Sequence, residues 1–215
     1  TKQFKQPYIT TVQSITPNGP YVTVTNNFIS DINGNNNSLA DYSELINFDV
    51  DLFNIGGGNS QNLSLVLSTN DQYISLIDSI ESINLINSNQ TLTTTNAFAF
   101  QVADFVPDQH IAAFQLSISD PQGNVWNSNI NVTLNSPILN HITYSINDMV
   151  SGNGNGKLDA GETLDIIVEI NNMGHADSYN LTGLLSSLGS YINFNNSSTT
   201  IPILNTTQSQ NVIFN

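Results

Sequence analysis

Apolar and polar residues alternate along most of the chain, and a period of two is typical of β-strands that bury one face. The clearest run is ELINFDVDLF (44–53), and NLSLVLS, NAFAFQV, AAFQLSIS and VWNSNINVTL follow it. Clusters of Asn, Gly, Pro and Ser separate these runs at short intervals, so the pattern predicts an all-β fold built as an antiparallel sandwich. The residues predicted to face the core are Ile46, Phe48, Val50, Leu52, Leu63, Leu65, Leu67, Phe98, Phe100, Val102, Phe114, Leu116, Ile118, Trp126, Ser128, Ile130, Val132 and Leu134.

The pattern also repeats over a long range. PYVTVTNNFISD (20–31) aligns with PILNHITYSIND (137–148), and residues 35–63 align with residues 153–181. An internal match of this length indicates tandem modules. The identical pairs include Asn35 with Asn153, Asn37 with Asn155, Asp41 with Asp159, Glu44 with Glu162, Asn54 with Asn172, Gly56 with Gly174, Leu63 with Leu181 and Tyr73 with Tyr191.

The repeat sets the expected domain boundaries. Residues 1–19 are predicted to be a linker or the end of a preceding domain, 20–136 a first module and 137–215 a second, incomplete one. Phe214 corresponds to Phe98, so the second module lacks counterparts of residues 99–136, about two strands, and exposes sheet edges. Either the parent protein continues beyond Asn215, which we favour, or another chain supplies the missing strands.

Composition narrows the range of partners. The chain has 34 Asn, three Lys plus Arg, and a net charge of −14, which argues against binding nucleic acid or an anionic membrane surface. No stretch approaches the roughly 20 apolar residues of a membrane span, so no membrane insertion is expected. The chain has no Cys, which excludes disulfides and thiolate chemistry. Cations are the natural partners of such a surface.

The loop SGNGNGKLDAGE (151–162) carries oxygen-bearing side chains at alternate positions, with glycines between them. This spacing lets a short backbone curl so that the oxygens converge, and calcium takes six to eight oxygens at roughly 2.3–2.6 Å. By analogy with an EF-hand loop, three carboxylates would offset the charge of the ion. The predicted ligands are Asp148, Asn153, Asn155, the carbonyl of Lys157, Asp159 and Glu162.

The first module repeats these ligands, which predicts a second structural calcium ion. It has Asn36, Ser38 and Ser43 where the other loop has glycine, so we expect this site to be weaker or less regular. The alternative interpretation is that both loops are plain polar turns. Calcium is favoured because the oxygen side chains recur while the glycines change. The predicted ligands here are Asp31, Asn35, Asn37, the carbonyl of Leu39, Asp41 and Glu44.

The sequence carries little sign of catalysis. The histidines, His110, His141 and His175, occupy different segments without the spacing of a metal trio, and surface or packing roles are expected for them. Nothing resembles a nucleophile elbow, so the chain is predicted to be non-catalytic. Trp126 and three tyrosines offer material for a sugar-stacking platform, but the place of Trp126 on an apolar strand face favours core packing.

The stretches NGNGKLDAGETLDIIVEINNMGHADSYNLTGLLSS (153–187), LSTNDQYISLID (67–78) and NAFAFQVADFVPDQHIAAFQLSISDPQGNVW (96–126) resemble the immunoglobulin-like modules of secreted Bacteroidetes proteins. Such modules follow the catalytic domain in gingipain-type cysteine peptidases. The resemblance covers nearly all of residues 20–215 and implies tandem immunoglobulin-like sandwiches of about seven strands, the second lacking its last strands. It also implies calcium loops and export, commonly by type IX secretion. The missing glycines of the first loop depart from the family pattern.

The expected function is that of non-catalytic, calcium-stabilised spacer or adhesion modules in a large secreted or cell-surface bacterial protein. The expected partners are other domains of the parent chain, together with surface glycans or proteins. Two alternatives stay open. The modules are accessory domains of a secreted peptidase whose catalytic domain lies outside this chain, or they form a carbohydrate-binding module.

Overall fold

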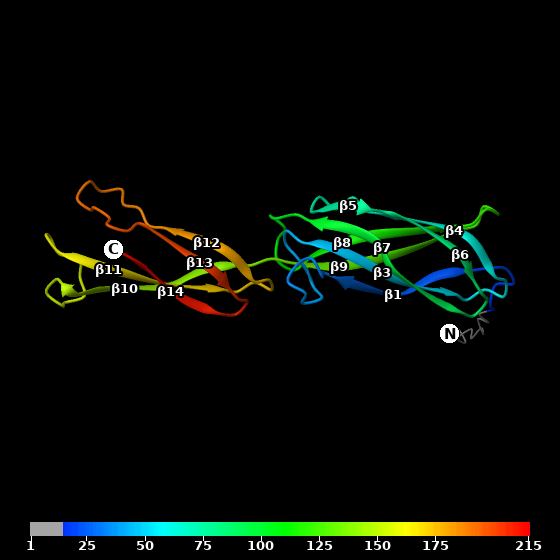
Figure 1. Ribbon diagram of the computed structural model, residues 1–215, viewed down its shortest axis with the longest axis horizontal. Helices are drawn as coiled ribbons and strands as arrows, with labels where there is room; N and C mark the ends of the chain where they lie inside the picture. Colours follow the sequence, from blue (N-terminus) through cyan, green and yellow to red (C-terminus); the bar gives the residue numbers. More distant parts are fainter. Residues whose placement is uncertain (1–14) are drawn as a thin grey trace, which may run out of the picture.

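The computed structural model describes residues 15–215, and the chain in this range folds into β-strands joined by turns, with no helix. The described range therefore has no helix that could cross a membrane. The all-β class predicted from the alternation is confirmed. In the first module the strands are β1 Val22–Ser30, β2 Ala40–Asp41, β3 Leu45–Asn54, β4 Ser60–Ser68, β5 Ile74–Asp78, β6 Ile80–Ile86, β7 Thr91–Val102, β8 His110–Ser119 and β9 Val125–Asn135 (Figure 1).

These nine strands form two sheets that face each other across one core. One sheet has the order β1-β3-β7-β5 and the other β2-β9-β8-β4-β6. Every pairing is antiparallel except that between β2 and β9, which is parallel. The short β2 therefore ties the segment before β3 to the far end of β9.

The core of the first module is built from the alternating apolar residues. Every apolar residue predicted to face the core is buried, because each strand turns alternate side chains inward, and Ser128 on the same face of β9 is half-buried. Phe48, Phe100 and Phe114 form its centre, with ring centroids 5.0–6.1 Å apart. Trp126 packs at the edge of this core, 6.3 Å from the ring of Tyr21, as its strand position predicts.

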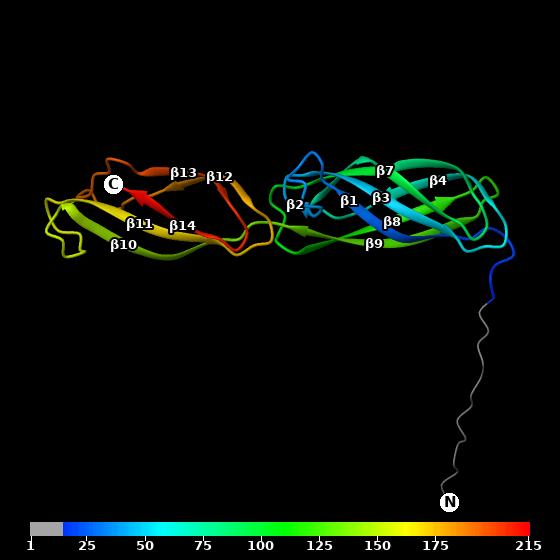
Figure 2. The same ribbon diagram turned by 60° about the horizontal axis from the view of Figure 1, so that its bottom comes forward.

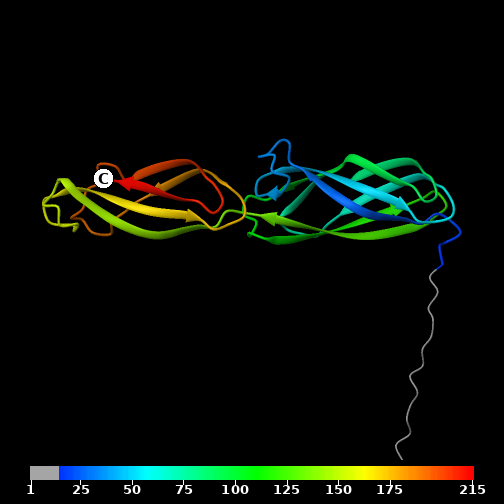
Figure 3. The same cartoon turned by 90° about the horizontal axis from the view of Figure 1, so that it is seen from below.

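The second module is smaller. Its strands are β10 Leu139–Ser151, β11 Thr163–Asn172, β12 Ser178–Leu184, β13 Ser198–Leu204 and β14 Ser209–Phe214, arranged as a β10-β11-β14 sheet and a β12-β13 pair. Only four hydrophobic residues form its buried cluster: Ile201, Leu204, Val212 and Phe214. The two modules lie end to end along the long axis of the molecule in all three views (Figures 1, 2 and 3).

The sequence repeat reappears as a repeat of strand pairing. β10, β11 and β14 pair as β1, β3 and β7 do, and β12 pairs with β13 as β4 does with β6. Residues 137–215 have no counterparts of β8 and β9. Residues 158–159 and 192–196 correspond to β2 and β5, but they form no strand. In the first module β2 pairs with β9 and β5 pairs with Ala99–Val102, and residues 137–215 contain no counterpart of either partner.

An identical buried asparagine ends β3 and β11. The Asn54 side chain is fully buried and makes four hydrogen bonds, accepting from the N–H groups of Tyr21 and Gly56 and donating to the carbonyls of Gly58 and Ile86. Asn172 makes the same four bonds in the second module, with Ile138, Gly174, Ala176 and Leu204. The glycine two residues later has no room for a Cβ, which would lie 2.1 Å from a carbonyl oxygen at Gly56 and 2.2 Å at Gly174. These matched contacts explain why both residue types recur.

Candidate metal centres

The first candidate loop joins β1 to β3 and is organised around buried carboxylates. Asp31, directly after β1, is 1% exposed and accepts the backbone N–H groups of Asn37 (2.8 Å) and Ser38 (3.1 Å). Glu44, directly before β3, accepts the N–H of Asn35 (3.0 Å) and that of Asp41 (3.1 Å). The two ends of the loop are thus closed by side chains that accept backbone bonds from within it.

Asp41 lies at the centre of this loop. Its Oδ2 accepts the Nδ2 groups of Asn35 (2.8 Å) and Asn37 (3.0 Å). The Oδ1 atom of Asn37 in turn accepts the N–H of Leu39 at 2.8 Å. All six residues predicted for this site therefore belong to one hydrogen-bonded loop.

The second loop, between β10 and β11, repeats this network. Asp159 Oδ2 accepts the Nδ2 groups of Asn153 (3.0 Å) and Asn155 (2.8 Å), and Glu162 accepts the N–H of Asn153 (2.9 Å). Asp148 accepts the N–H of Asn155 (3.0 Å), as Asp31 accepts that of Asn37. The N–H of Lys157 bonds the Oδ1 of Asn155 at 2.8 Å, so this site also has all its predicted residues in one loop.

The backbone follows the same path in both loops despite the missing glycines. Gly154, Gly156 and Gly161 have φ values of 75°, 69° and 88°. The matching residues of the first loop are Asn36, Ser38 and Ser43, with φ values of 59°, 65° and 62°. Three non-glycine residues thus adopt a left-handed conformation, which is sterically unfavourable for them. The first loop is as regular as the second, contrary to our expectation, and its relative affinity stays a prediction.

The two loops differ in burial. Asp41 and Glu44 are 2% and 9% exposed, whereas Asp159 in the second loop lies in solvent. The difference follows from β9, because β2 pairs with its end and Asn135 donates its Nδ2 to Asp41 Oδ1 at 3.0 Å. Residues 137–215 have no strand in the place of β9.

The chemistry of both loops suits a hard cation. Burial raises the pKa of Glu44, and the negative charges of Asp41 and Asp31 add to this effect, although two backbone hydrogen bonds oppose it. Lys157 is the only Lys or Arg among the described residues, so no basic side chain neutralises the first loop. In the second loop, Glu162 Oε2 is buried and has no hydrogen-bond partner. Unneutralised carboxylates of this kind fit a calcium ion.

Amide and carbonyl oxygens are needed to complete either shell. Within residues 15–215, no group of three or more His, Cys, Asp or Glu side chains is placed to hold a metal by itself. The Asn35 and Asn37 amides direct nitrogen toward Asp41 while their Oδ1 atoms accept backbone N–H groups. Coordination by these amide oxygens therefore requires both side chains to turn.

Two histidine–aspartate pairs lie outside the loops. His110 Nε2 is 2.7 Å from Asp71, with its ring packed edge-on against Tyr73, and His175 Nδ1 is 2.7 Å from Asp108. Neither pair could be read from the sequence, because the partners are 39 and 67 residues apart and belong to different segments. His175 joins the two modules, which no local motif signals.

Comparison with known proteins gives little further information. No protein-family model matches the chain, and no curated protein matches it. Among solved structures, the secreted serine protease VesC from Vibrio cholerae aligns with 91% of this chain at 11% identity and a TM-score of 0.31. The chain spans 43% of that protein. Similarity this low carries no argument about fold or function.

Proposed function

We propose that the chain consists of two tandem immunoglobulin-like β-sandwiches that act as calcium-stiffened, non-catalytic spacer or adhesion modules. The second sandwich lacks the strands that correspond to β8 and β9. The observation that carries the proposal is the duplicated loop. Two segments with different residues at their left-handed positions keep the same carboxylates, the same asparagines and the same hydrogen bonds.

Calcium is the cation that this donor set fits. All the candidate ligands are oxygens, and calcium prefers carboxylate, amide and carbonyl oxygen in flexible loops. The ion would be held by Asp31, Asp41 and Glu44 with the two asparagines in the first loop, and by the equivalent residues in the second. Its role is structural: it neutralises the carboxylates and joins the end of one strand to the start of the next.

The end-to-end arrangement supports a spacer role. The modules follow each other along one axis, with a linker of only three residues, 136–138, between β9 and β10 (Figure 2). Such a chain holds its ends apart when its loops and joints are stiff. Placement in an exported or cell-surface bacterial protein, with other domains of that protein as partners, rests on the sequence resemblance.

Calorimetric titration and thermal unfolding test the calcium proposal. We expect two calcium ions per chain, and raised unfolding midpoints in excess calcium relative to EDTA. At a free concentration 100 times the Kd, each ion stabilises its module by about 2.7 kcal/mol. That corresponds to a rise of roughly 10–20 °C for a module of this size. Magnesium at the same concentration is the control. Identical midpoints in calcium and EDTA would overturn the proposal.

A further inference from the structure

The joint between the modules is hydrogen-bonded on both sides of its short linker. The N–H of Ser136 donates to Asp108 Oδ1 at 3.0 Å, and its carbonyl accepts the N–H of His175 at 3.2 Å. Ile138, two residues later, donates its N–H to the buried Asn172 of the second module at 3.1 Å. The linker is therefore hydrogen-bonded to both modules in this structure.

Asp108 holds one side of this joint. It belongs to the turn before β8, yet it accepts both the backbone N–H (3.2 Å) and the ring Nδ1 (2.7 Å) of His175 in the second module. Burial opposes its ionisation, but hydrogen bonds from Ser136 and His175 more than offset this and lower the pKa of Asp108. The carboxylate thus binds the linker and the second module together.

The first cation loop forms the other side of the joint. The hydroxyl of Tyr42 accepts the N–H of Tyr179, at the start of β12, at 3.4 Å. In Figures 1 and 2 this loop lies at the end of the first module that faces the second. A cleft of about 430 Å³ separates them, lined by Gly34, Asn35, Asp41, Tyr42, Ser43 and Glu44 from the loop and by Asp177 and Tyr179 from the second module.

Asp41 connects the candidate ion directly to the linker. Its Oδ1 accepts Nδ2 of Asn135, the last residue of β9 and the residue before Ser136. The backbone carbonyl of Asn135 accepts the N–H of Tyr42 at 2.9 Å. A change in the position of Asp41 therefore acts on both contacts of the joint, through Asn135 on the linker and through Tyr42 on the second module.

We propose that a cation in the first loop controls the stiffness of the joint between the modules, an inference that rests on the calcium proposal above. Without the cation, Asp41 and Glu44 line the same cleft as Asp177, and their repulsion acts across the joint. With the cation, this charge is neutralised and Tyr42 and Asn135 are fixed. The orientation of the second module then varies less.

The second loop supplies a matched control. It has the same side-chain ligand residues, and Asp159 accepts the same two asparagine side chains as Asp41 does, but it lies at the end of the second module remote from the joint (Figure 3). A cation there stiffens its own loop and leaves the joint unchanged.

Spin labels measure the joint directly, and the absence of native Cys makes their placement simple. Asn129→Cys on β9 and Thr182→Cys on β12 place one label at an exposed site in each module. We expect the distribution of label distances to be narrower in calcium than in EDTA. Asp41→Asn should abolish this narrowing, and Asp159→Asn should retain it.

Calorimetry on the same samples separates the two proposals. If calcium binds at two sites but does not narrow the distribution of label distances, the joint proposal is overturned and the calcium proposal stands. If calcium does not bind, both proposals are overturned. Tyr42→Phe guards against misfolding of the Asp41 variant, because it keeps every proposed ligand and removes only the hydroxyl that accepts from Tyr179. The Tyr42→Phe variant should bind two calcium ions, but calcium should narrow its distribution of label distances less than that of the unchanged protein. If calcium narrows the distribution of label distances fully in both single variants, Tyr42→Phe and Asp41→Asn, the joint proposal is overturned.

Discussion

The two candidate loops share their side-chain ligand residues and most of their hydrogen bonds, but have different surroundings. Asp41 is buried beneath β9 and bonded to Asn135, whereas Asp159 lies in solvent. The local sequence therefore sets the shape of each loop, and a strand nearly a hundred residues away sets how much water reaches it. Carboxylates repel more strongly where water is excluded, so burial strengthens the mutual repulsion of the carboxylates more in the first loop than in the second.

The two loops also differ in the residues at their left-handed backbone positions. The exposed second loop has glycine at all three left-handed positions, while the first loop has asparagine and serine there. The loop with the sterically costly backbone is the one that is packed against β9 and the neighbouring module. Packing can hold a strained conformation that an exposed loop adopts only with glycine.

Removing either buried asparagine should have the largest effect on stability. Asn54→Ala and Asn172→Ala each leave two N–H groups and two carbonyls of the surrounding turns without their partner. An unsatisfied buried polar group costs about 1–3 kcal/mol, so we expect each module to lose roughly 3 kcal/mol or more. Urea unfolding of the full chain measures this loss.

The exposed Asn59 on the turn after β3 is the control: it accepts a single hydrogen bond, from the N–H of Ser88, so Asn59→Ala should cost only about 0.5–1.5 kcal/mol. A loss of similar size in both modules would show that they share one scaffold. A loss confined to the first module would contradict the equivalence of the two turns.

Removing one loop carboxylate should affect one ion at a time. Asp41→Asn and Asp159→Asn each take away a charge from a proposed shell, so calorimetry should find one calcium ion per chain in place of two. The stabilisation of that module by calcium, about 2.7 kcal/mol at 100 times the Kd, should disappear while the other module keeps its own. Loss of both ions in either single variant would contradict independent sites.

The pH dependence should separate the buried loop from the exposed one. The folded-state pKa of Glu44 is raised above its ordinary value of 4.5, so in EDTA, at a pH between these two pKa values, the folded state holds a proton that the unfolded state has released. The free energy of unfolding of the first module should therefore fall as pH rises from about 4.5 through the folded pKa. Hydrogen bonds from Asn155 and Asn153 lower the pKa of Asp159, so the second loop should lose stability as pH falls through that lower pKa.

In calcium, the free energy of unfolding of the first module should instead rise with pH, because the ion binds the ionised carboxylate. Chemical denaturation between about pH 2 and pH 7, with calcium and with EDTA, measures both pH dependences. Glu44→Gln should remove the dependence in EDTA. An unchanged slope in this variant would assign the effect to other groups.

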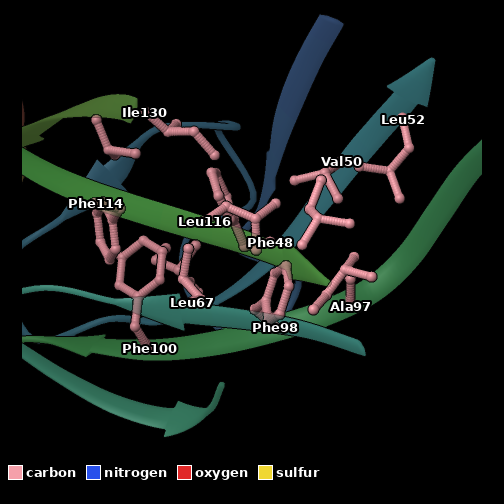
Figure 4. Close-up of a cluster of buried hydrophobic side chains, with 14 of the residues drawn as sticks. Phe48, Val50, Leu52, Leu67, Ala97, Phe98, Phe100, Phe114, Leu116 and Ile130 are labelled. Atoms are coloured by element: carbon pink, nitrogen blue, oxygen red, sulfur yellow. The ribbon is translucent and has the colours of Figure 1, made fainter. Parts of the chain in front are cut away.

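The fold class was readable from the sequence because strand burial has a period of two. Phe48, Phe100 and Phe114 were predicted on core faces and meet at the centre of the core (Figure 4). The repeat likewise indicated which oxygens share a loop. In both cases the information lies within a few residues along the chain.

What the sequence did not reveal depends on contacts between distant segments. The bond from Asn135 to Asp41 and the pairing of His175 with Asp108 join residues 94 and 67 positions apart. Neither pair has a pattern of spacing, because Asp41 and Asn135 meet through the pairing of β2 with β9, and Asp108 and His175 meet across the joint between the modules. The left-handed serines were also hidden, since serine seldom adopts that conformation and only the aligned glycines point to it.

Exchanging serine and glycine at matched positions should give the smallest effect. Left-handed backbone costs an L-residue about 1–2 kcal/mol, and the greater freedom of glycine in the unfolded chain offsets about 0.5–1 kcal/mol of the relief. Ser38→Gly and Ser43→Gly should therefore each stabilise the first module by about 0.5–1 kcal/mol. Urea unfolding in EDTA measures this gain without a contribution from the ion.

The reverse changes complete the comparison. Gly156→Ser and Gly161→Ser introduce a Cβ that meets no atom within 4 Å, so only the backbone cost remains. Each should destabilise the second module by a similar amount. A larger loss in the second module than the gain in the first would mean that packing against β9 and the joint already relieves part of the strain at Ser38 and Ser43. Equal and opposite changes would mean that the strain is intrinsic to the loop and that its surroundings only tolerate it.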